Sequence, residues 1–79
     1  MTPKRIVVVI ARAERAPEAL RAAVGLTLRG DRVDLCPRVP LDRADPWVAR
    51  ALAALATLGG DAAAPLSAVR EADCVEVWS

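Results

Sequence analysis

The sequence of 79 residues has no histidine, no tyrosine and no phenylalanine, and it has only two cysteines. Histidines and closely spaced cysteines are the usual zinc ligands, so we expect no metal site. Two cysteines at distant positions also exclude a disulfide framework. With two tryptophans as the only aromatic residues, the core must consist of Val, Leu, Ile and Ala. Such a thin core favours the burial of further apolar surface against another chain.

An excess of either charge is also missing, because eleven basic and ten acidic residues give a net charge of +1. Without a basic stripe or a polybasic cluster, we expect neither nucleic acid nor a membrane surface as a partner. The apolar run that starts at Ile6 is too short for a signal sequence or a membrane span. We therefore expect a cytoplasmic protein with a single domain over residues 1–79.

The strongest pattern that is present is a strand with apolar residues on both faces. The segment Arg5–Ile10 contains five consecutive β-branched residues. A strand of this kind must be covered on both sides, which is typical of the central strand of a parallel sheet. We expect the rest of the chain to form that cover.

Two helices are predicted from apolar stripes at helical spacing and from their end signals. The first runs from Pro17 to about Arg29, and Gly30 follows as a left-handed stop. The second runs from Pro46 to about Leu58, with Asp45 as its N-cap and two glycines after its end.

Two further strands are predicted from alternation of polar and apolar residues. They lie at residues 31–36 and 73–78, and each has one covered face. Residues 62–64 are three alanines, which leaves a short strand and an extended link as alternatives there. One or two helical turns are expected over residues 66–71.

These elements predict an α/β protein with a parallel sheet of three to four strands. The all-apolar strand takes the centre and the alternating strands flank it, in the order 2-1-3, with residues 62–64 as an optional extra strand. Crossovers of one hand then place helices on both faces of the sheet, the two main helices on opposite faces. Ligands of open α/β sheets bind beside the carboxyl ends of the strands.

Three arginines are predicted at that carboxyl edge. Arg12 and Arg15 follow the first strand, and Arg38 follows the second. Together with the amino end of the first helix they form a candidate site for phosphate, sulfate or a carboxylate. The loop has no glycine-rich cradle, so neither the P-loop nor the dinucleotide fingerprint is present, and we expect no cofactor. Solvated arginines in an arginine-rich chain are the alternative interpretation.

Cys36 is the candidate catalytic residue if any thiol in this chain reacts. It ends a strand at the ligand-binding edge, and Arg38 is near enough to favour a thiolate. Cys74 begins its strand at the opposite edge, close to Glu71 and Asp73. We expect no disulfide between the two cysteines, because opposite edges of the sheet are farther apart than the roughly 7 Å that a disulfide allows between Cα atoms. Inert packing in the sheet is the alternative for both.

Three segments together resemble a known family. The strand Ile6–Ile10, the helix and turn Pro17–Val33, and the closing segment Glu71–Trp78 are similar to DsrE/DsrF-like proteins, the superfamily that includes the TusBCD sulfur-relay subunits. The resemblance implies a small flavodoxin-like subunit, usually oligomeric. In some members a cysteine near the end of the strand that follows the second helix carries sulfur as a persulfide. The matching stretch here, Gly60–Pro65, contains no cysteine.

Three functions follow as hypotheses. The first is an oligomeric DsrE-like subunit that assembles with itself or with a related subunit, linked to sulfur metabolism or relay by resemblance and without the usual relay cysteine. The second is a binding module for a small anion at Arg12, Arg15 and Arg38. The third is a thiol-based enzyme that uses Cys36.

Overall fold

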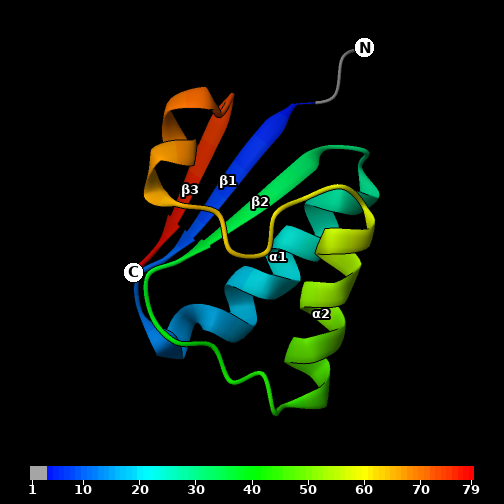
Figure 1. Ribbon diagram of the computed structural model, residues 1–79, viewed down its shortest axis with the longest axis vertical. Helices are drawn as coiled ribbons and strands as arrows, with labels where there is room; N and C mark the ends of the chain where they lie inside the picture. Colours follow the sequence, from blue (N-terminus) through cyan, green and yellow to red (C-terminus); the bar gives the residue numbers. More distant parts are fainter. Residues whose placement is uncertain (1–3) are drawn as a thin grey trace.

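The computed structural model describes residues 4–79 and shows an α/β fold with three parallel strands (Figure 1). Residues 1–3 of the predicted domain lie outside this range. The elements in chain order are β1 (Arg5–Ile10), the 3₁₀ turn η1 (Ala13–Arg15), α1 (Ala16–Leu28), β2 (Arg32–Pro37), α2 (Pro46–Thr57), the 3₁₀ helix η2 (Leu66–Glu71) and β3 (Cys74–Trp78). The strand order is β2-β1-β3, which confirms the predicted arrangement.

The end signals of the helices act as the sequence predicts. The Asp45 carboxylate accepts a hydrogen bond of 2.8 Å from the Trp47 backbone N–H at the start of α2. Gly30 and Gly59 follow the two helices with φ angles of +90° and +88°, which favour glycine because it has no Cβ. No helix of residues 4–79 is both long and apolar enough to cross a bilayer.

Both main helices cover the same face of the sheet, and the prediction that they lie on opposite faces is wrong (Figure 1). The side chains of Ile6, Val8 and Ile10 on β1 form one buried cluster with residues from α1 and α2. The opposite face, with Val7 and Val9, is covered by alanines from residues 61–72. Because of this arrangement one side of the sheet has a thick cover and the other a thin one.

The connection from β2 to β3 explains why the prediction failed. Two crossovers of the same hand that lead to opposite sides of β1 must pass over opposite faces. This requirement applies to the segment that enters β3, which is η2, and η2 does lie on the face opposite to α1. The handedness rule does not decide on which face α2 lies. Its apolar stripe packs on the same face as α1 and beside that helix.

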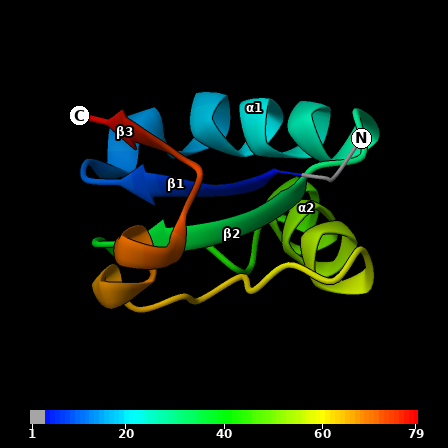
Figure 2. The same cartoon turned by 90° about the horizontal axis from the view of Figure 1, so that it is seen from above.

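The chain reaches the second face by passing along the outer side of β2 (Figure 2). The backbone N–H of Leu35 donates to the Asp61 carbonyl at 2.7 Å, and the N–H of Ala64 donates to the Leu35 carbonyl at 2.8 Å. Residues 61–64 are thus neither a strand nor fully extended: Ala62 and Ala63 form a turn, and only Asp61 and Ala64 on either side of it bond to β2, so we call this segment the link. They cover one of the two edges of the sheet.

A buried carboxylate holds this link and the sheet together. The Asp34 side chain on β2 is fully buried and accepts hydrogen bonds from the Arg5 guanidinium at 2.8 Å and from the Asp61 backbone N–H at 2.9 Å. Arg5 also pairs with Glu71 at 2.7 Å, and its backbone N–H donates to the Asp73 carboxylate at 2.8 Å. The network therefore connects β1, β2, the link and both ends of the turn into β3.

The pKa of Asp34 lies below its ordinary value. Burial alone raises this pKa, but the Asp61 N–H, the Arg5 guanidinium and the charge of Arg32 stabilise the carboxylate more strongly. The pKa of Arg5 is raised in return, chiefly by its hydrogen bond to Asp34 and then by that to Glu71. The ion pair is therefore present throughout the neutral pH range.

The change Asp34→Asn is expected to lower the free energy of unfolding by about 2 kcal/mol, because it removes the buried negative charge and replaces one of the two acceptor oxygens with a donor that faces another donor. Urea unfolding followed by circular dichroism measures the loss. Arg32→Gln serves as the control, since Arg32 is exposed and its ion pair with Asp34 is longer, at 3.3 Å. An equal loss in both variants would contradict the central role of Asp34.

The same carboxylate predicts how stability depends on pH. The folded pKa of Asp34 is depressed, whereas the unfolded chain binds the proton near pH 3.9. The contribution of Asp34 is therefore present above about pH 4 and is lost as the pH falls through the lower folded pKa. We expect the difference in unfolding free energy between wild type and Asp34→Asn to shrink in acid. A difference that stays constant from pH 7 to acid would contradict this assignment.

Candidate functional site

The three predicted arginines lie at the carboxyl edge of the sheet, but only two of them lack a partner there. The backbone N–H of Arg38 donates to the Ile10 carbonyl at 2.8 Å, so the loops after β1 and β2 meet at this edge. Arg15 pairs with Glu18 at 3.0 Å, and its guanidinium lies 5.2 Å from the centre of the Trp78 ring. Arg12 and Arg38 are exposed and form no ion pair within residues 4–79. The anion site at these residues stays a prediction.

The two cysteines differ in exposure in the opposite sense to their predicted reactivity. Cys36 is 1% exposed and packs in the cluster that contains Val9, Ala64 and Ala68. Cys74 is exposed at the start of β3. The position of Cys36 at the end of a strand, close to Arg38, predicts an accessible thiol. In the structure its side chain is instead covered by η2. This burial does not support Cys36 as a catalytic nucleophile.

The outer edge of β3 is the feature that sequence reasoning missed. The strand pairs with β1 on one side, from Cys74 opposite Ile6 to Trp78 opposite Ile10, and no strand of residues 4–79 lies on its other side. The N–H of Ala11 donates to the Trp78 carbonyl at 2.9 Å. Because backbone direction alternates along a strand, Val75 and Val77 direct their own N–H and C=O groups outward.

The side chains of the same two valines are also exposed. Val75 is 37% and Val77 62% exposed, although the alternating sequence predicts a covered face for both. Their face is the one with the thin cover, where Ala64 and Ala68 reach only the centre of the sheet. The exposure of Val75 and Val77 could therefore be predicted only from residues 61–72, whose short, alanine-rich sequence covers this face, and not from the sequence of β3 itself.

On its other face β3 carries an acid and an aromatic residue. In parallel pairing, Glu76 and Trp78 share the face of Val8 and Ile10, where Trp78 packs against the main core cluster. Arg15 lies over the Trp78 ring at this place. The open edge thus has apolar side chains on one face, and a carboxylate beside an arginine-covered tryptophan on the other.

Comparisons with known proteins leave the chain to be interpreted from its own geometry. A scan against protein-family models, a search of curated proteins and a search of solved structures each gave no match. The fold and the edge define a small parallel α/β protein in which the outer edge of β3 has no partner strand among residues 4–79. The resemblance to DsrE-like proteins stays a prediction.

Limited alkylation with iodoacetamide is expected to modify Cys74 well before Cys36, because only Cys74 is exposed in the folded protein. Peptide mapping by mass spectrometry gives the two rates. In urea the protection of Cys36 should disappear, which is the control for burial. Faster modification of Cys36 in the folded protein would restore it as a candidate nucleophile.

Proposed function

We propose that this protein is a subunit of a homo-oligomer in which β3 pairs with β3 of a second copy. The observation that carries the proposal is the open edge of β3, where Val75 and Val77 expose both backbone and side chains. An unpaired strand edge is a template for further pairing unless charge, proline or a bulge protects it. Here the outward valines offer no such protection.

Antiparallel pairing about a two-fold axis gives a continuous sheet across two copies. Residues directly opposite each other then lie on the same face, so the axis passes beside a single residue of β3. An axis at Glu76 brings two carboxylates together, which is unfavourable. An axis at Val77 pairs this valine with itself and places Glu76 opposite Trp78 of the second copy.

The axis at Val77 is also favoured by charge. Arg15 covers Trp78 in each copy, so each Glu76 approaches the arginine of the other copy. The two-fold axis repeats this contact. On the other face Val77 packs against Val77 of the second copy, with Val75 one pair further out, and full burial of a valine side chain contributes about 1.5 kcal/mol or more. Valine contact and charge therefore favour the axis at Val77 over the axis at Glu76.

The resemblance to DsrE-like proteins adds support, since the small subunits of that family are usually oligomeric. The proposal includes no sulfur-transfer step. Gly60–Pro65 lacks the cysteine of a relay subunit, and Cys36 is buried. The function that we propose is assembly.

Light scattering coupled to gel filtration is expected to show a species of twice the 8.4 kDa chain mass at micromolar concentration. Val77→Lys should give a monomer, because it places two like charges at the axis and lysine is a common edge protector. Leu28→Lys is the matched control, since Leu28 is 81% exposed on α1 and lies away from β3. A wild-type monomer, or equal effects of the two lysines, would refute the proposal.

A further inference from the structure

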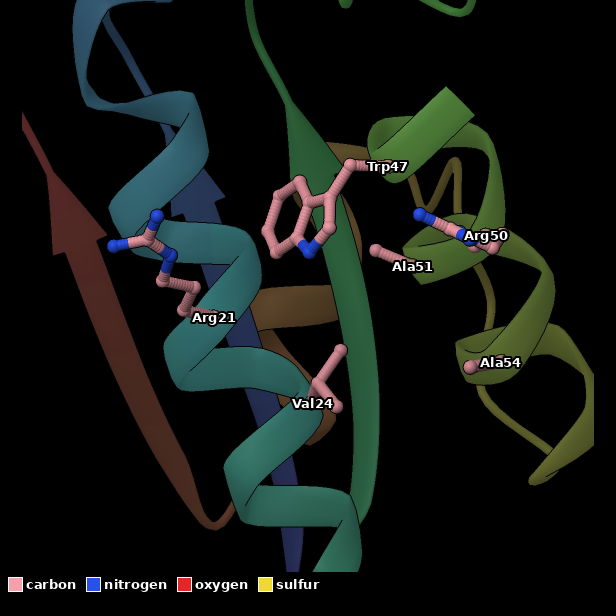
Figure 3. Close-up of a pocket in the computed structure, with 6 residues that line it drawn as sticks. All are labelled: Arg21, Val24, Trp47, Arg50, Ala51 and Ala54. Atoms are coloured by element: carbon pink, nitrogen blue, oxygen red, sulfur yellow. The ribbon is translucent and has the colours of Figure 1, made fainter. Parts of the chain in front are cut away.

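A second surface lies on the opposite, thickly covered side of the molecule, in a groove between α1 and α2 (Figure 3). It has a volume of about 440 Å³ and is lined by Arg21 and Val24 from α1 and by Trp47, Arg50, Ala51 and Ala54 from α2. The indole of Trp47 lies between the two helices in this view. The groove does not involve β3, so it is separate from the proposed dimer interface.

The groove exists because the two helices meet through small residues on their outer side. The bulky residues of α2, Leu52 and Leu55, are buried toward the sheet. Between the helices the buried Ala51 and the half-buried Ala54 have short side chains, and these leave a hollow. On α1, Gly25 is exposed, and a Cβ at this position would contact nothing within 4 Å. Space for an additional element is therefore open along both helices.

Two exposed leucines continue the walls of the groove. Leu28, the last residue of α1, lies four residues after Val24, and Leu58, the C-cap that follows α2, lies four residues after Ala54, so each continues the same side of its helix. Leu28 is 81% and Leu58 57% exposed, and they are among the most exposed large apolar side chains of the described residues. From Trp47 to Leu58 the strip is about 16 Å long at 1.5 Å per residue, which corresponds to about three helical turns.

The charges at the groove have one sign. Arg21 and Arg50 stand on opposite walls, and no acidic residue lines the groove. Neither arginine forms an ion pair with any residue of the range 4–79. The Arg21 guanidinium instead lies 5.8 Å from the centre of the Trp47 ring. An occupant must therefore be apolar along its centre and acidic on both sides.

We propose that the α1–α2 groove binds an amphipathic helix of a partner protein, with an apolar stripe flanked by Asp or Glu. A long, shallow strip with regularly spaced apolar side chains is typical of helix-in-groove recognition. A second copy of this chain is a poor occupant, because it brings the same arginines to the groove. Trp47 acts as the central anchor, and the two arginines select the sign of the flanking charges.

The test uses two labelled helical peptides that share a stripe of leucines over about four turns and carry either Glu or Lys beside it. Fluorescence anisotropy should show that the Glu peptide binds the wild-type protein about tenfold or more tightly than the Lys peptide. Trp47→Ala should weaken binding of the Glu peptide by about tenfold. The double variant Arg21→Glu/Arg50→Glu should reverse the preference and bind the Lys peptide, which also shows that it is folded.

A control with the same change in charge is Arg12→Glu/Arg70→Glu, since both residues are exposed and lie outside the groove. It should keep the preference for the Glu peptide. Val77→Lys should bind the Glu peptide as wild type does. The experiment therefore distinguishes failure of the proposed β3 dimer from failure of the proposed peptide binding at the groove. Equal binding of both peptides, no binding at micromolar concentration, or a preference that survives the Arg21/Arg50 reversal would overturn the proposal. Direct binding of hexanoate without binding of either peptide would overturn it in favour of a small ligand.

Discussion

The carboxylate of Asp34 is the interaction on which the positions of the other elements depend. It lies in the interior of a chain with a small core, and it is satisfied because Arg5 and the Asp61 N–H reach it from two directions, with Arg32 as a third and longer contact. A buried charge without partners is strongly unfavourable, so the network fixes where these partners must be. The link after α2 is thereby held against β2, and η2 is held over the second face through Glu71.

The two faces of the sheet are built from different amounts of side chain, and both proposed interfaces follow from this difference. Two helices with leucines cover one face, while a short 3₁₀ helix with alanines covers the other. On the thin side the cover ends before β3, and the valines of β3 stay exposed. On the thick side the alanines that let the helices pack closely leave the groove at Trp47.

The local patterns of the sequence predicted the elements well. Five β-branched residues, the Asp45 cap and the glycines at positions 30 and 59 identified β1 and the helix ends, because each depends on nearest neighbours in the chain. The position of α2 was not predictable in this way. The hand of a crossover restrains the segment that enters β3, and here that role belongs to the weakly patterned residues 61–72.

The candidate site was harder to predict for the same reason. Exposure of Val77 and burial of Cys36 are decided by how far η2 reaches, and the period of a strand carries no information about the length of its cover. Arg12, Arg15 and Arg38 were placed at the correct edge from strand ends alone. Which of these arginines would contact other side chains was not predictable, because the contact of Arg15 with Trp78 joins distant parts of the chain.

Gly60 decides whether the sheet has one free edge or two. A Cβ at this position would clash with the backbone carbonyl of Val33, so only glycine lets the link lie along β2. A molecule with a single free edge can form a closed pair and then has no edge left to extend. With the link displaced, β2 would be free as well, and each copy could add another at both ends. In the assembly that we propose, the missing side chain at position 60 would thus separate a closed pair from a fibre that grows at both ends.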